Sequence, residues 1–128
     1  MNPPAEDEEY TFKRTFTVED VEQFAALSKD TQPQHTEPDS DGRLMVHGLL
    51  TATLPTKIGG DLEVLAYNME FEFRRPVYTG EEITCTWRNE TVQELDDRYE
   101  LTVDVTCVNE RDELVLDATL GGIVWKEQ

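Results

Sequence analysis

Apolar residues recur with a helical spacing near the N-terminus and with a strand-like alternation in the second half of the chain. In its first quarter, Val21, Phe24, Ala25 and Leu27 recur at helical spacing, and Thr17 directly precedes a first turn that carries acidic residues. A hydroxyl side chain before the first turn and acids within it both stabilise a helix N-terminus. The pattern therefore predicts a helix over residues 18–28.

Apolar and polar residues alternate across much of the second half. The alternation is plain at Ile83, Cys85 and Trp87, which are separated by threonines. Such a period of two is typical of strands with one buried face. Short polar turns separate the last segments and leave no room for crossover helices, so the sheet should be antiparallel. We expect strands over 10–16, 62–77, 82–95, 98–109 and 113–126.

The region between these two patterns contains a long loop and an apolar helix. Residues 29–43 are polar and contain two prolines and a glycine, which indicates a loop without regular structure. An apolar segment follows, and it predicts a buried helix from near Gly48 to Gly59 and Gly60, with a kink at Pro55. One buried helix and a long antiparallel meander predict an α+β fold with the helix on the concave face of a curled sheet.

The length of 128 residues suits one domain with one core. Residues 1–9 are acidic and proline-bearing, so we expect a flexible leader there and a single domain over 10–128. No apolar run approaches the roughly 20 residues that span a bilayer, and the N-terminus has no signal-peptide core. These features predict a cytoplasmic protein.

The charge of the chain is strongly negative. Asp and Glu number 28 against 11 Lys and Arg, which gives a net charge of -17. Such a surface repels phosphate, so nucleic acid and anionic membranes are not expected partners. Only four of the cations are lysines and the acids are spread along the chain, which resembles proteins of salt-accumulating halophiles.

The two cysteines carry no expected chemistry. Cys85 and Cys107 lie in predicted strands and lack the CxxC spacing of metal or redox sites. We interpret them as reduced thiols of the core. No metal and no cofactor is expected.

Asp30 and His35 stand five positions apart in the long loop, with Pro33 between them. A carboxylate and an imidazole together can hold a water molecule and move its protons. Taken alone, the spacing is weak, because a solvated histidine near a carboxylate is the more frequent case.

The sequence His47-Gly48-Leu49 opens the predicted apolar helix. Free N–H groups and the positive end of the helix dipole favour an anion there, and glycine lets a ligand approach the backbone. Taken alone, the glycine could equally mark an ordinary helix start, and His47 could simply cap or pack.

Together and in this order, the motifs resemble a known family. FTVEDVEQFAALSKD is followed by four residues and a histidine, then by MVHGLLTATL and FEFRRPVYTGEEI. This sequence is similar to the MaoC-like R-specific enoyl-CoA hydratases over nearly the whole chain, from Phe16 to Val124. The resemblance implies a hot-dog fold, an acyl-CoA or acyl-carrier thioester as substrate, and a homodimer or higher homo-oligomer.

The resemblance also implies roles for single residues. Asp30 and His35 would activate water for syn addition to a trans-2-enoyl thioester, and the backbone N–H of Gly48 would bind the thioester oxygen. His47 and Leu49 flank that glycine and count as substrate-binding candidates with it. Thr56 matches a small hydroxyl residue near the site of the family, although it could equally lie on the helix surface.

Two departures from the family pattern leave alternatives open. Gln32 replaces the usual asparagine, and the stretch over 36–45, which would help to form the acyl pocket, is short. The acyl chain length is therefore open. An acyl-CoA thioesterase and a non-catalytic acyl-thioester binding module remain alternatives, because one fold hosts several functions.

Overall fold

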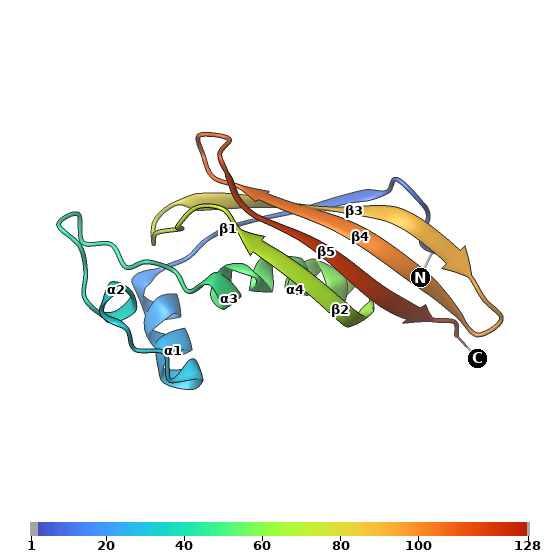
Figure 1. Ribbon diagram of the computed structural model, residues 1–128, viewed down its shortest axis with the longest axis horizontal. Helices are drawn as coiled ribbons and strands as arrows, with labels where there is room; N and C mark the ends of the chain where they lie inside the picture. The colour runs from blue at the N-terminus through green and yellow to red at the C-terminus, as the bar shows by residue number, and fades with distance from the viewer. Residues whose placement is uncertain (1–2, 128) are drawn as a thin grey trace.

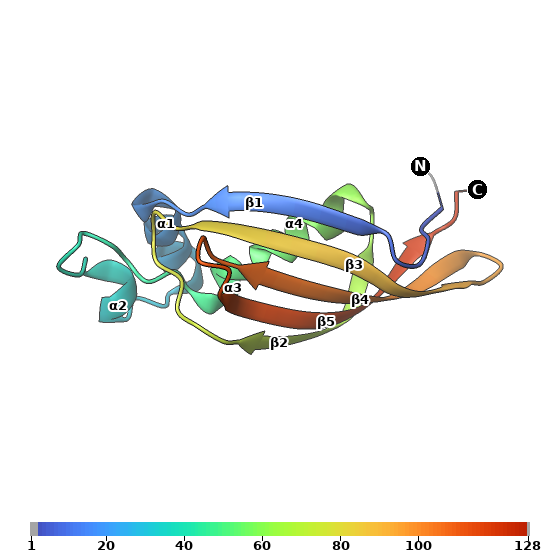
Figure 2. The same ribbon diagram turned by 90° about the horizontal axis from the view of Figure 1, so that it is seen from above.

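The computed structural model describes residues 3–127 as one curled antiparallel sheet with helices on its concave side and at one end (Figures 1 and 2). The strand order is β1-β3-β4-β5-β2, and every neighbouring pair is antiparallel. The predicted α+β class is confirmed. The strands are β1 Glu9–Thr15, β2 Leu65–Phe73, β3 Glu82–Glu94, β4 Arg98–Val108 and β5 Leu114–Trp125.

The first helix, α1, spans Val18–Ser28, as its apolar spacing predicts. Thr17 accepts a hydrogen bond from the Asp20 N–H, and the Asp20 carboxylate accepts one from the Thr17 N–H. This reciprocal capping box satisfies two N–H groups that a helix start leaves free. Lys29 ends the helix in the left-handed region at φ 67° and directs the chain toward the candidate loop.

The apolar segment forms two short helices, α3 (Gly48–Thr51) and α4 (Thr53–Asp61). The single helix kinked at Pro55 was therefore a wrong prediction. Proline lacks an N–H and its ring clashes with the carbonyl four residues earlier, here that of Thr51. The helix is consequently interrupted at Ala52, one turn before the proline, and α4 continues through Gly59 and Gly60 to Asp61.

Helix α4 packs against the inner face of the sheet and closes the core. Leu54 and Ile58 of the helix are buried, as are the inward residues Ile83, Cys85 and Trp87 of β3. A Cβ atom at Gly59 would lie 3.3 Å from the Trp87 ring, so glycine allows the helix to approach this strand closely. The predicted strand alternation thus corresponds to burial against α4.

Strand β2 is shorter than the predicted segment over 62–77. Leu62 caps α4 and Glu63 adopts a φ of 58°, so the chain turns before the strand begins. After Phe73 the chain passes Pro76, which cannot donate to a sheet ladder. β2 lies at one edge of the sheet, beside β5.

The N-terminal segment runs alongside β3. The Asp7 N–H donates to the Asn89 carbonyl and the Asn89 N–H donates to the Glu8 carbonyl, at 2.8 Å and 2.9 Å. Of the predicted leader over 1–9, residues 1 and 2 lie outside the described residues. None of the helices within 3–127 is long and apolar enough to cross a bilayer.

The long loop over 29–43 contains one helical turn that its composition did not predict. Helix α2 spans Pro33–Thr36, and Pro33 occupies its first turn. A proline is well suited there, because the first N–H groups of a helix have no intrahelical partner and its fixed φ is already helical. Figure 1 shows α2 beside α1, at the end of the sheet where α3 begins.

Candidate active site

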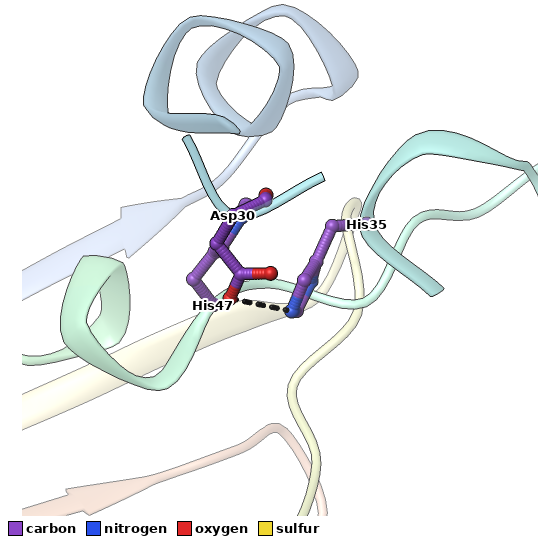
Figure 3. Close-up of side chains that lie close together, drawn as sticks. All are labelled: Asp30, His35 and His47. Atoms are coloured by element: carbon purple, nitrogen blue, oxygen red, sulfur yellow. Dashed lines mark hydrogen bonds and ion pairs between the residues drawn. The ribbon is translucent and has the colours of Figure 1, made fainter. Parts of the chain in front are cut away.

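The structure brings Asp30 and His35 together. Asp30 follows the end of α1 and His35 lies in α2, so the tight turn through Pro33 brings both side chains to one place (Figure 3). The His35 Nε2 atom lies 3.8 Å from the Asp30 Oδ2 atom. The imidazole is buried, whereas 38% of the carboxylate side chain is exposed.

A backbone carbonyl fixes the orientation of His35. Its Nδ1 atom lies 2.7 Å from the Met45 carbonyl oxygen. Because a carbonyl oxygen only accepts, Nδ1 carries the hydrogen, and in the neutral ring Nε2 presents a lone pair. The Met45 N–H in turn donates to the Gln34 carbonyl at 2.8 Å, so two hydrogen bonds join Met45 to α2.

Gln32 holds the other oxygen of the acid. Its side-chain amide donates to Asp30 Oδ1 at 2.9 Å, and its backbone N–H lies 3.4 Å from the same atom. This hydrogen bonding to Gln32, with a smaller contribution from the nearby histidines, lowers the pKa of Asp30 below its ordinary value. Asp30 is therefore ionised near neutral pH, with Oδ2 directed toward His35.

His47 lies beneath this pair. Only 3% of its surface is exposed, and its Nε2 atom lies 3.0 Å from the Asp30 carbonyl oxygen. Its ring stacks on that of His35, with centroids 3.7 Å apart and planes 15° apart. The predicted candidate thus belongs to the cluster, but it does not line the cavity described next.

A surface cavity of about 450 Å³ lies against His35. Gly48, the first residue of α3, forms part of its wall, and the N–H of a first helical residue has no intrahelical acceptor. A Cβ atom at Gly48 would lie 2.8 Å from the Phe73 ring, so glycine allows the half-exposed aromatic to lie directly against the start of α3. The cavity is lined by Gln34, His35, Met45, Val46, Gly48, Thr51, Phe73, Arg74, Arg75, Pro76, Val77 and Val115.

Two other predicted residues lie away from the cavity. Leu49 points outward with 63% of its surface exposed, and Thr56 lies on the exposed side of α4 with its hydroxyl donating to the Ala52 carbonyl. Thr51 lines the cavity instead and is 2% exposed. The helical spacing of three residues from Gly48 could have indicated Thr51, because residues i and i+3 share a helix face.

The arginines at the cavity mouth are already paired. Arg74 donates to both carboxylate oxygens of Asp117, and Arg75 lies 3.6 Å from Glu113. These acids balance the positive charge of the two arginines. The mouth is therefore close to neutral rather than strongly basic.

Asp30, His35 and His47 each offer a ligand atom within 4.8 Å of the others. Metal ions bind imidazole along the nitrogen lone pair, in the plane of the ring. The two nearly parallel rings do not direct their lone pairs at one point, and His47 Nε2 faces a carbonyl oxygen. The arrangement suits proton transfer better than metal binding.

Comparisons with known proteins agree with this geometry. No family model matches the chain. It is 29% identical over 110 residues to a mitochondrial 3-hydroxyacyl-(acyl-carrier-protein) dehydratase of Arabidopsis thaliana, covering 80% of this chain and 66% of that protein. The chain thus spans about two thirds of the length of this relative.

Solved structures share the whole architecture. The (R)-hydratase from A. caviae involved in PHA biosynthesis superposes with a TM-score of 0.83 at 23% identity, over 95% of this chain and 98% of that one. A MaoC-like dehydratase from Rhodospirillum rubrum gives a TM-score of 0.80 at 18% identity, over 98% and 95% of the two chains. The predicted hot-dog fold is confirmed, and the structural neighbours are MaoC-like dehydratases and (R)-hydratases.

Proposed function

We propose that this chain is an enoyl-thioester hydratase, which in reverse is a 3-hydroxyacyl-thioester dehydratase, with Asp30 and His35 as its acid/base pair. The observation that carries the proposal is the 3.8 Å approach of His35 Nε2 to Asp30 Oδ2 beside a cavity that Gly48 also lines. The names of the relative and of the structural neighbours support the same reaction class.

The spacing of the pair suits one water molecule. A water oxygen at a hydrogen-bond distance of about 2.8 Å from both His35 Nε2 and Asp30 Oδ2 would form an angle of about 85° with these two atoms. That angle is about 20° smaller than the one between the two O–H bonds of water, a difference that slightly bent hydrogen bonds accommodate. Water would thus donate to Asp30 Oδ2 and to the lone pair of His35 Nε2, and direct its own lone pair at the substrate.

The side chains of Asp30 and His35 and the backbone of Gly48 can carry out every step of the reaction. The water oxygen bonds to C3 of the enoyl chain as one of its protons passes to His35 Nε2, and the double-bond electrons move toward the thioester oxygen. The Asp30 carboxylate stabilises the imidazolium. The Gly48 N–H donates to the negative oxygen, a contribution often worth a few kcal/mol. The proton on His35 is then delivered to C2, which completes the addition of H and OH.

We also propose that the chain acts as a homodimer that pairs along the β2 edge. Leu65, Tyr67, Met69 and Phe73 of this edge strand are 43% to 63% exposed. An open edge with apolar side chains is a pairing surface. A second copy there would also cover Phe73 and the cavity beside it. Light scattering should give twice the chain mass, whereas a fully active monomer would contradict the dimer.

A cytoplasmic location is part of the proposal. Cys85 and Cys107 are register partners on β3 and β4, and both are buried free thiols. Cysteines that lie side by side and remain reduced are typical of a reducing compartment. A side-chain hydrogen bond with Cys85, together with burial, raises the pKa of the Cys107 thiol, so it stays protonated.

The reaction class is tested with crotonyl-CoA as substrate. Hydration removes the absorbance of the conjugated enoyl thioester and releases no thiol. We expect that absorbance to fall to a hydration equilibrium with no free thiol detected. Stoichiometric thiol release would identify a thioesterase, and binding without either change would identify a non-catalytic module.

A further inference from the structure

We propose that His47 is a positioning residue that holds both members of the Asp30 and His35 pair and does not itself touch substrate. The inference rests on the proposed function. It revises the role that the motif comparison suggests for His47, which was direct substrate binding.

The first contact of His47 is with the backbone of Asp30. The Nε2 atom lies 3.0 Å from the Asp30 carbonyl oxygen, and since that oxygen only accepts, Nε2 carries the hydrogen. The bond spans 17 residues and links the residue before α3 to the end of α1. It therefore sets where the Asp30 backbone, and with it the carboxylate, stands relative to the cavity.

The second contact of His47 is with the ring of His35. The stack, at 3.7 Å between centroids, covers one face of the catalytic imidazole. Among residues 3–127, the ring of His35 makes one hydrogen bond, from Nδ1 to the Met45 carbonyl, which alone leaves the ring plane free to tilt. Stacking against a buried ring restricts that tilt and keeps Nε2 directed toward Asp30.

The surroundings of His47 within residues 3–127 leave its ring no direct contact with a substrate. The ring is 3% exposed and absent from the cavity wall, and the Phe24 ring of α1 packs against it at 4.9 Å. Its Nδ1 atom is buried and has no hydrogen-bond partner within 3–127. A ring with one nitrogen bound to a carbonyl and the other enclosed has no atom to offer a substrate.

Two substitutions separate the two contacts. His47→Gln keeps an amide N–H near the position of Nε2 but removes the ring, whereas His47→Phe keeps a stacking ring but removes the donor. Support for a catalytic group is commonly worth 10- to 100-fold in activity. We expect each variant to lower kcat for crotonyl-CoA hydration by roughly 10-fold or more, with KM changed by less than about twofold.

A double-mutant cycle distinguishes positioning from a merely structural effect. If the ring of His47 acts by stacking on His35, then His47→Gln, which removes that ring, should change kcat by less than about twofold in a His35→Ala background. Asn89→Ala is the matched control, since Asn89 is a buried polar residue bound to Trp87 and Ala5. It should lower the melting temperature and leave the kcat of the folded protein unchanged.

The outcomes separate this inference from the proposed function. Unchanged kcat in both folded His47 variants, or an equal loss with and without His35, would overturn the positioning role while leaving the hydratase intact. A wild-type protein without hydration activity would instead overturn the proposed function. Loss of kcat that disappears in the His35→Ala background supports the inference.

Discussion

The side-chain amide of Gln32 donates to Oδ1 of Asp30 at 2.9 Å, and this bond leaves Oδ2 as the oxygen that faces His35. The sequence showed this glutamine only as a departure from the asparagine of the resembled family. In the fold, its longer side chain reaches back over one residue to the acid. This hydrogen bond thus both orients the carboxylate and lowers its pKa.

Replacing this amide should shift the titration of the acid. Gln32→Met removes the donor that stabilises ionised Asp30, so the pKa of Asp30 should rise from its lowered value toward the ordinary one. Carbon NMR of the Asp30 carboxyl during a pH titration measures this. Gln23→Met is the control, because Gln23 bonds Glu19 on the exposed side of α1. An unchanged Asp30 titration in Gln32→Met would contradict the assignment.

The same shift has a consequence for stability. A carboxyl whose pKa is lower in the folded than in the unfolded state stabilises the fold fully above the unfolded value. That contribution is lost as the pH falls through the lower, folded value. The stability difference between wild type and Gln32→Met should therefore persist at neutral pH and disappear in acid.

A side chain at Gly48 should displace Phe73. In Gly48→Ala the new Cβ would lie 2.8 Å from the Phe73 ring and force this half-exposed ring to move, at a cost of up to about 1 kcal/mol in the free energy of unfolding. Thermal or urea unfolding measures the loss, and adding Phe73→Leu should recover part of it. Gly60→Ala is the control, because nothing lies within 4 Å of its Cβ position and alanine favours helix. Equal stability of wild type and Gly48→Ala would contradict the packing.

Salt should stabilise the protein. The net charge of -17 creates repulsion that is screened as the Debye length falls from about 10 Å at 0.1 M salt to about 3 Å at 1 M. We expect the melting temperature to rise between 0.1 M and 2 M KCl. Replacing Glu22, Glu70 and Glu90 together by glutamine should reduce that rise. A melting temperature independent of KCl would contradict the halophilic interpretation.

Most of the fold could be predicted from the sequence, because the spacing of apolar residues along a helix or strand indicates which of its faces is buried. Helix α1 and the inward residues of β3 follow from spacing: Val21 and Ala25 are buried and Phe24 packs against the core, although Leu27, which shares the pattern, is 80% exposed. The break at Ala52 was not predicted, because the effect of Pro55 reaches four residues back and no side chain marks the break itself.

The site was predicted only in part, for a related reason. Asp30, His35 and Gly48 are near one another in the chain or in a motif, and the structure brings them together. Thr56 lies away from the cavity, and Thr51, which lines it, was not predicted, because no side chain marks the interruption between α3 and α4. The stack of His35 on His47 depends on tertiary packing of α1 and has no sequence signal.

The most direct test of the account is the kcat of crotonyl-CoA hydration in Asp30→Asn and His35→Ala beside wild type. Asp41→Asn is the matched control, because Asp41 lies in the same loop with its side chain 74% exposed. We predict that both site variants fold, as shown by circular dichroism, and lose roughly 100-fold or more in kcat, whereas the control keeps wild-type activity. Wild-type turnover in either folded site variant would contradict the assignment of Asp30 and His35 as the acid/base pair.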